Sequence, residues 1–101
     1  MPMRELLNEE QRLAILLTLG EADGYRLNEG MLKSVLSSVA LVVDRDDVRG
    51  HLDWLARQGL VTVQKMPTET TGELWIAALT ERGNAVRQGR SHPGVKRADP
   101  P

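Results

Sequence analysis

Apolar positions in the middle of the chain follow first a helical and then a strand-like spacing. The helical part has its apolar residues at i, i+4 and i+7, on one side of a helix: Val48, Leu52 and Leu55. Asp44 stands where an N-cap belongs, and Gly59 stands where a left-handed residue ends a helix. Residues 60–65 then alternate as in a strand. The pattern therefore predicts a helix over 44–58 that runs directly into a strand.

Two further helices are predicted before this segment. The first begins at an Asn8 N-cap with Gln11 in a capping box, and its inner face comprises Leu13, Leu16 and Leu17. Ile15 and Leu19 lie on another side, so this helix would carry a second apolar face. The second helix begins at an Asn28 N-cap, after a short extended stretch, and its stripe comprises Met31, Leu32, Val35, Leu36 and Val39.

The chain after residue 65 reads as a hairpin, a helix and a tail. A polar turn over 66–72 leads to a second strand at 74–77, and a short helix runs from the Thr80 N-cap to about residue 90. Residues 91–101 contain three prolines and little apolar material, which is typical of a disordered tail. The expected organisation is one folded domain over 1–90 followed by a disordered tail over 91–101.

The order helix, helix, helix, strand, turn, strand, helix resembles the winged helix-turn-helix regulators of the MarR, ArsR and PadR types. The resemblance is most specific in Leu52–Val61 and Leu79–Gly83, which in such families mark the reading helix entering the wing and the start of the next helix. The short length, the Leu-Asn-Glu-Glu-Gln-Arg start and the Pro-Gly-Val-Lys-Arg tail are similar to small winged-helix proteins of Mu-like phages and prophages. The resemblance implies an α+β, mostly α fold with three helices, a two-stranded β-hairpin wing and a short C-terminal helix.

Winged-helix proteins of this kind place the reading helix in the major groove of double-stranded DNA, and the resemblance implies the same for helix 44–58. We expect Arg45 and Arg49 to contact bases or phosphates, since an arginine fork matches guanine. We expect Arg57 and Lys65 to hold the DNA backbone. The alternative is that these arginines form surface ion pairs with neighbouring aspartates, which would contribute little to stability. The implied function is a small, phage-encoded transcriptional regulator that works as a homodimer.

Acidic residues at the start of the same helix argue against tight DNA binding. Asp44, Asp46 and Asp47 suit an N-cap and a first turn, where carboxylates complement the helix dipole. A second hypothesis follows, in which the protein is a winged-helix protein-interaction module that does not bind DNA. Trp54 would then anchor a protein partner, although it could also pack under the wing. For the DNA-binding hypothesis, Ile15 and Leu19 are the expected homodimer interface.

Composition narrows the classes of function. The chain has 101 residues, a formal net charge of −1 and a pI near 6.1, which is low for a nucleic-acid binder. It contains no cysteine and two distant histidines, so no metal site is expected. No motif suggests a cofactor or catalysis, and no apolar run approaches the roughly 20 residues of a membrane span. Without a secretory signal, the expected location is the cytoplasm.

Overall fold

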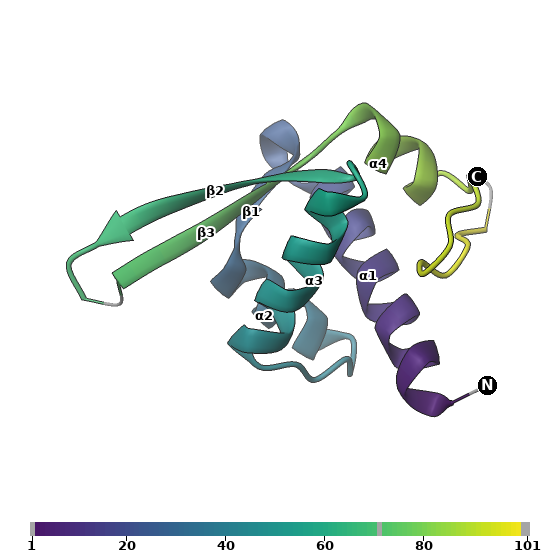
Figure 1. Ribbon diagram of the computed structural model, residues 1–101, viewed down its shortest axis with the longest axis horizontal. Helices are drawn as coiled ribbons and strands as arrows, with labels where there is room; N and C mark the ends of the chain where they lie inside the picture. Colours follow the sequence, from purple (N-terminus) through teal and green to yellow (C-terminus); the bar gives the residue numbers. More distant parts are fainter. Residues whose placement is uncertain (1, 71, 100–101) are drawn as a thin grey trace.

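Four α-helices and a three-stranded antiparallel sheet make up the part of the chain that the computed structural model describes, residues 2–70 and 72–99 (Figure 1). In chain order the elements are α1 (Met3–Glu21), the 3₁₀ turn η1 (Asp23–Tyr25), β1 (Arg26–Asn28), α2 (Glu29–Ser38), α3 (Arg45–Arg57), β2 (Val61–Thr68), β3 (Gly72–Leu79) and α4 (Glu81–Arg87). The predicted α+β, mostly α class is confirmed. The short extended stretch adds β1 as a third strand beside the two-stranded wing.

Helix α3 has the ends that the sequence predicts. Asp44 accepts a hydrogen bond from the backbone N of Asp47 at 2.7 Å, and the Asp47 carboxylate accepts one from the backbone N of Asp44 at 3.2 Å. Gly59 has a φ of +76°, and the backbone N of Leu60 returns to the carbonyl of Leu55 at 3.0 Å. The predicted stripe of this helix is fully buried. Local sequence therefore determines both the extent and the rotation of α3.

Helix α1 differs from the prediction in two ways. It begins after Pro2 instead of at Asn8, because the residues between them are good helix formers that simply extend the helix. Ile15 and Leu19, expected to be a second exposed face, are fully buried, whereas Leu17 is 40% exposed. The physical reason is that α1 is central and contacts α2, α3, α4 and β3. Ile15 and Leu19 therefore cannot serve as a homodimer interface in this fold, and that prediction is wrong.

The sheet has the strand order β1-β3-β2, and its hairpin projects well beyond the helices (Figure 1). Both wing strands are longer than predicted, since pairing continues through Met66↔Leu74 to Thr68↔Gly72. The expected turn is correspondingly shorter, and its residue Thr71 lies outside the described residues. The outer wing does not pack against the hydrophobic core. Its side chains therefore show no apolar alternation that a sequence pattern could reveal.

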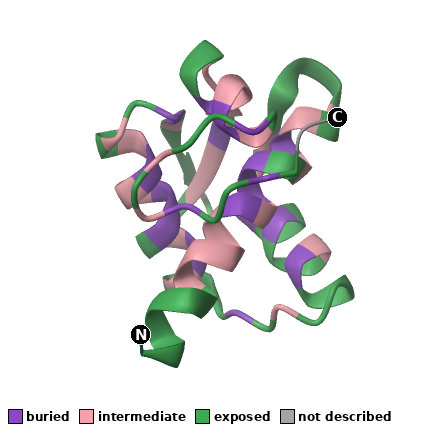
Figure 2. Cartoon of the chain, turned by 90° about the vertical axis from the view of Figure 1, so that its right-hand side faces the viewer, coloured by how far each residue is buried: buried purple, intermediate pink, exposed green. Residues whose placement is uncertain are grey.

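The C-terminal tail is ordered against the helices, contrary to the prediction of disorder over 91–101. Val95 and Ala98 are buried, the backbone N of Lys96 donates to the carbonyl of Glu9 at 3.2 Å, and the Lys96 side chain pairs with Glu10 at 3.1 Å. Figure 2 shows the tail crossing the helices, with the first turns of α1 exposed below it. Buried apolar side chains and polar contacts together hold this segment. Pro100 and Pro101 lie outside the described residues.

Helix α4 starts as predicted, since the Thr80 hydroxyl accepts a hydrogen bond from the backbone N of Gly83 at 3.0 Å. It ends at Arg87, slightly earlier than expected. Within residues 2–70 and 72–99, no helix has the length and apolar character needed to cross a membrane.

Candidate nucleic-acid interface

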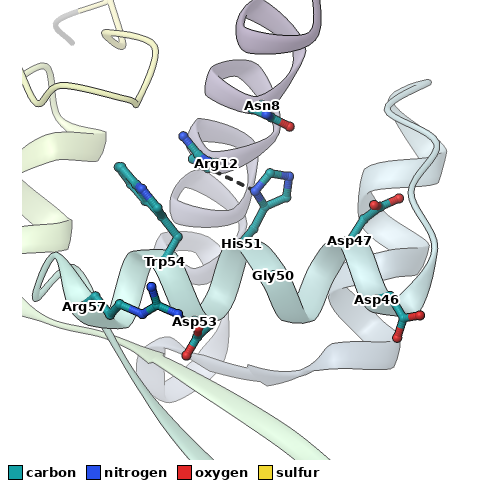
Figure 3. Close-up of a pocket in the computed structure, with 9 residues that line it drawn as sticks. All are labelled: Asn8, Arg12, Asp46, Asp47, Gly50, His51, Asp53, Trp54 and Arg57. Atoms are coloured by element: carbon teal, nitrogen blue, oxygen red, sulfur yellow. Dashed lines mark hydrogen bonds and ion pairs between the residues drawn. The ribbon is translucent and has the colours of Figure 1, made fainter.

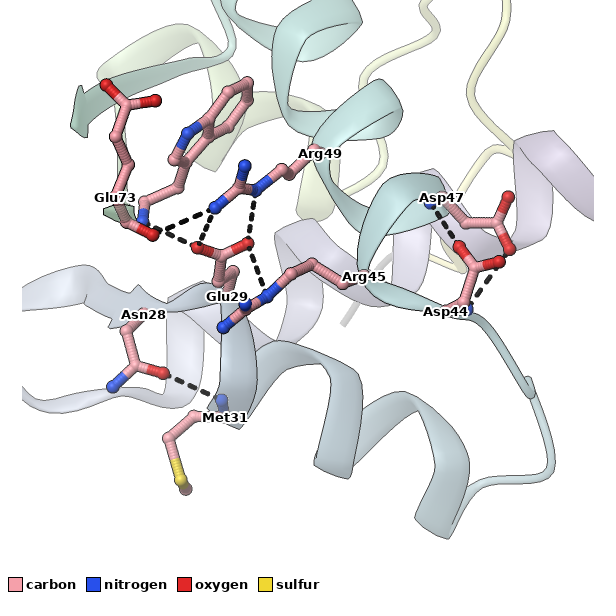
Figure 4. A network of polar contacts seen from close by, with 9 residues as sticks. Asn28, Glu29, Met31, Asp44, Arg45, Asp47, Arg49 and Glu73 are labelled. Atoms are coloured by element: carbon pink, nitrogen blue, oxygen red, sulfur yellow. Dashed lines mark hydrogen bonds and ion pairs between the residues drawn. The ribbon is translucent and has the colours of Figure 1, made fainter. Parts of the chain in front are cut away.

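The candidate interface consists of the N-terminal half of α3, the first residue of α2 and the middle of the wing, where Trp75 pairs with Lys65. These parts meet at the carboxylate of Glu29, which is only 2% exposed (Figure 4). Arg49 donates from Nε to Oε1 at 2.6 Å and from Nη2 to Oε2 at 2.9 Å, forming a two-pronged ion pair. The backbone N of Trp75 in β3 also donates to Oε2, at 2.8 Å. Glu29 thereby connects α2, α3 and the wing.

Arg45 completes this cluster from the first position of α3. Its Nε lies 3.3 Å from Glu29 Oε1, and its side chain is 45% exposed. Of the predicted DNA-contacting arginines on the Glu29 side of α3, this is the more accessible one, because the Arg49 side chain is only 25% exposed. The structure therefore brings Arg45 and Arg49 together, as the predicted interface requires, and gives them different surroundings.

Arg49 has several protein partners. Besides Glu29, it donates from Nη2 to the carbonyl of Glu73 at 3.0 Å, and its guanidinium lies 4.8 Å from the centre of the Trp75 ring. The hydrogen bond from Arg49 lowers the pKa of Glu29 below its usual value, and the same bond raises the pKa of Arg49. Both groups are thus charged at neutral pH. Arg49 is therefore the more constrained of the two arginines.

The remaining predicted DNA contacts, Arg57 and Lys65, are at the surface. Arg57 forms an ion pair with Asp53 one turn earlier on α3, which is the surface pairing considered as the alternative from sequence. Lys65, on β2, places its amino group 4.4 Å from the centre of the Trp75 ring. The Trp75 ring therefore makes cation–π contacts with one residue of α3 and one residue of the wing. Arg57 lies at the far end of α3 and does not join this cluster.

The other side of α3 faces α1 across a groove of about 400 Å³ (Figure 3). Three aspartates of α3 line it: Asp46, Asp47 and Asp53. Arg12 of α1 reaches into it, and its guanidinium lies 4.1 Å from the centre of the Trp54 ring. Arg12 also donates to the carbonyl of Gly94 at 3.0 Å. The groove is therefore acidic on balance, because three aspartates outnumber Arg12 and Arg57, and the stacked Arg12 closes it towards the tail.

Trp54 packs against the tail, so the expectation that it lies under the wing is wrong. His92 meets its ring edge-on with centroids 6.0 Å apart. Gly94 approaches so closely that an added Cβ would lie 2.5 Å from the ring. With Arg12 on it as well, Trp54 is half-buried inside the protein and is not free to anchor a partner. The helix spacing correctly placed Trp54 on the flank of α3. The tail, which the composition had suggested was disordered, covers it there.

His51 is a buried residue that sequence reasoning did not single out. Its Nδ1 accepts a hydrogen bond from Arg12 Nε at 3.3 Å, and its Nε2 lies 2.7 Å from Gln11 Oε1. The ring is therefore neutral with its proton on Nε2, which donates to Gln11. Burial, together with the charge of Arg12, lowers the pKa of His51 from 6.5 to about 4.

Glu29 was also missed, because an acid in a first helical turn is ordinary in sequence. The one sequence feature that marks Glu29 is that it directly follows the N-cap Asn28. The Asn28 side chain accepts a hydrogen bond from the backbone N of Met31 at 2.9 Å. That cap fixes the rotation of α2, but the arginines that meet Glu29 come from a distant segment. Among the described residues, no group of histidine and acidic side chains has the arrangement of a metal site.

Comparison with known proteins places the chain among phage and bacterial proteins. No family model matches it. It is 38% identical over 99 residues to the uncharacterized protein gp26 of Escherichia phage Mu, covering 97% of each chain. It is 33% identical over 101 residues to an uncharacterized protein of Haemophilus influenzae, covering 100% of this chain and 94% of that one.

Among solved structures, the chain resembles Bacillus subtilis PadR, crystallised in complex with operator DNA. The TM-score is 0.64 at 21% sequence identity, over 91% of this chain. The chain spans about half of PadR, because the match covers 51% of that protein. This likeness concerns the fold, which is a winged helix. The chain therefore belongs to the protein family that includes gp26 of phage Mu, and it has the winged-helix fold.

Proposed function

We propose that this protein is a small transcriptional regulator that binds double-stranded DNA with α3 in the major groove and the wing along the neighbouring backbone. The observation that carries the proposal is the exposed guanidinium of Arg45 at the start of α3, beside a wing that presents Lys65. Residues at the start of a recognition helix are those that reach base edges. The fold that this chain shares with operator-bound PadR supports the same placement.

The charges at this surface favour modest affinity for a single chain. Arg57 is paired with Asp53, and three aspartates line the groove beside α3. Phosphate contacts dominate protein–DNA affinity, so a surface with few unpaired cations binds weakly alone. We therefore include a homodimer in the proposal, since two copies double the number of contacts on a symmetric site. The relationship to gp26 supports a phage or prophage origin and action in the host cytoplasm.

Selection from a random double-stranded DNA library at low salt, followed by affinity measurements at rising salt, tests this function. The affinity of the wild-type protein should fall steeply as salt increases, because bound cations are released from the DNA. Arg45→Ala and Lys65→Ala should each weaken binding about three- to tenfold at fixed salt. Arg90→Ala removes the same charge from an exposed position after α4 and is the matched control.

The control variant should bind within about twofold of the wild type, since Arg90 follows α4, away from α3 and the wing (Figure 1). Affinity that does not respond to salt would contradict the proposal. So would an Arg45→Ala/Lys65→Ala double variant that binds as tightly as the wild type.

The second candidate function is a protein-interaction module, and the acidic groove between α1 and α3 favours it. A basic segment of a partner protein fits three carboxylates better than DNA does. Capture from a host lysate, with and without nuclease, separates the two functions. Retention of a protein after nuclease treatment, lost in an Asp46→Asn/Asp53→Asn variant, would favour the interaction module.

A further inference from the structure

We propose that Glu29 is a positioning residue for DNA recognition, which holds the guanidinium of Arg45 in place so that its free edge selects guanine. The inference rests on the proposed DNA binding and assigns it a base preference. It begins from the contrast between the two partners: the Glu29 carboxylate is 2% exposed, whereas the Arg45 side chain that it contacts is 45% exposed. A fixed group inside the protein thus holds a side chain that reaches its surface.

Glu29 is suited to this role because three hydrogen bonds fix the position of its carboxylate. The Arg49 fork bonds both carboxylate oxygens, at 2.6 and 2.9 Å, and the backbone N of Trp75 bonds Oε2 at 2.8 Å. The carboxylate also follows an N-cap that fixes the start of α2. Rotation of the Glu29 side chain would break several charged hydrogen bonds at once. The oxygen that meets Arg45 is therefore a rigid acceptor.

Arg45 comes closest to Glu29 through Nε, and almost half of the Arg45 side chain is exposed. The contact with Glu29 uses Nε, at 3.3 Å, on one edge of the planar group. In this proposal the edge formed by Nη1 and Nη2 faces the DNA, since two parallel N–H donors match O6 and N7 of guanine in the major groove. A long side chain that is already oriented loses less freedom on binding. Guanine at the base that Arg45 contacts is the expected preference.

The cluster itself carries a net positive charge, while Asp46 and Glu73 also act on Arg49 from nearby. Arg45 and Arg49 share the single carboxylate of Glu29, so the three side chains carry one net positive charge. Arg49 lies against Trp75 and the carbonyl of Glu73, which leaves Arg45 as the accessible cation of the three. Figure 4 shows Arg45 reaching Glu29 from α3. The cluster thus has one structural and one recognising arginine.

A double-mutant cycle between Glu29 and Arg45 tests the inference. The variants are Glu29→Gln, Arg45→Ala and the two combined. The measured quantity is the ratio of affinities for the selected duplex and for the same duplex with its contacted guanine replaced by 7-deazaguanine, which lacks N7. The wild type should discriminate on the order of tenfold. Glu29→Gln should lose most of this discrimination, and Arg45→Ala should lose all of it.

The coupling between the two residues decides the outcome. If Glu29 acts through Arg45, Glu29→Gln changes discrimination by less than about twofold once Arg45 is alanine. An equal loss in both backgrounds would overturn the role of Glu29 while leaving DNA binding intact. A wild-type protein that binds no duplex at all would instead remove the proposed function itself.

Arg45→Lys provides a second route that keeps Glu29 and its bonds to Arg49 and Trp75. Lysine keeps the charge but offers a point donor in place of a planar pair. Its affinity should stay within about threefold of the wild type, and its guanine discrimination should fall to near one. Undiminished discrimination by Arg45→Lys would contradict the inference, even if Glu29→Gln failed to fold.

Discussion

The buried imidazole of His51 makes the fold sensitive to mild acid. Its pKa in the folded protein is about 4, below the ordinary 6.5, because burial and the charge of Arg12 oppose protonation. Between these values the unfolded chain binds more protons, so stability falls as the pH drops from 6.5 towards 4. Asp47 partly offsets this by favouring the charged ring, and Arg4 adds to it. The loss is at most about 3 kcal/mol.

Urea unfolding at pH 7 and pH 4.5 measures this effect. The wild-type protein should lose stability between the two pH values, whereas His51→Gln, which cannot be protonated, should lose clearly less. His92→Gln is the control, because His92 packs edge-on against Trp54 and is less buried. The explanation fails if His51→Gln retains the full wild-type loss.

At the candidate site, the sequence predicted where the arginines lie but not which residues they contact. The spacing on α3 correctly placed Arg45, Arg49 and Arg57 off the buried stripe. The partner of the first two, Glu29, comes from another helix, and no local pattern links them. Whether an arginine is ion-paired or available to a ligand depends on which acidic residue the tertiary fold brings beside it. Only the pairing of Arg57 with Asp53, one turn apart, was visible from sequence.

At the scale of elements, segments whose boundaries are set by local chemistry were predicted well. The caps at Asn28, Asp44 and Thr80 and the glycine stop at Gly59 are all where the sequence indicates. The inner face of α1 was not predicted correctly, because a helix surrounded by other elements is buried on more than one side. The tail was missed for the opposite reason, since its order depends on a few long-range contacts and not on composition.

The docked tail depends on the absence of a side chain at Gly94. This residue has a φ of +85°, and a Cβ would lie 2.5 Å from the Trp54 ring. Gly94→Ala should therefore detach the tail from α1 and α3, with a loss of about 1–3 kcal/mol from strain and lost contacts. Hydrogen exchange at the backbone N of Lys96, which is bonded to Glu9, reports the detachment directly.

Ser91→Ala is the matched control for this experiment, since Ser91 is an exposed residue of the same segment. It should leave the protection of Lys96 unchanged. If Gly94→Ala also preserves that protection, the close approach to Trp54 is not what holds the tail.

At the scale of the whole molecule, the proposed homodimer needs a surface other than Ile15 and Leu19. The first turns of α1 offer Met3, Leu6 and Leu7, all exposed at the free end of the helix. A helix end with this apolar content favours burial against a second copy. A Leu6→Glu/Leu7→Glu variant should therefore sediment as a monomer under conditions in which the wild type is dimeric. It should also bind DNA at least tenfold more weakly.

Leu17→Glu carries a similar change to a half-exposed position further along α1 and serves as the control. It should leave the sedimentation coefficient and the DNA affinity unchanged. A wild-type protein that sediments as a monomer at all concentrations used for DNA binding would refute the dimer.

The placement of the two tryptophans gives the molecule two separate optical reporters. Trp54 lies between Arg12, His92 and the tail, whereas Trp75 lies between Arg49 of α3 and Lys65 of the wing. The chain contains no other tryptophan. The emission of one ring thus depends on tail docking and that of the other on the joint between α3 and the wing. Replacing either by phenylalanine isolates the remaining signal, so that motion at the two ends of α3 can be timed independently in the same protein.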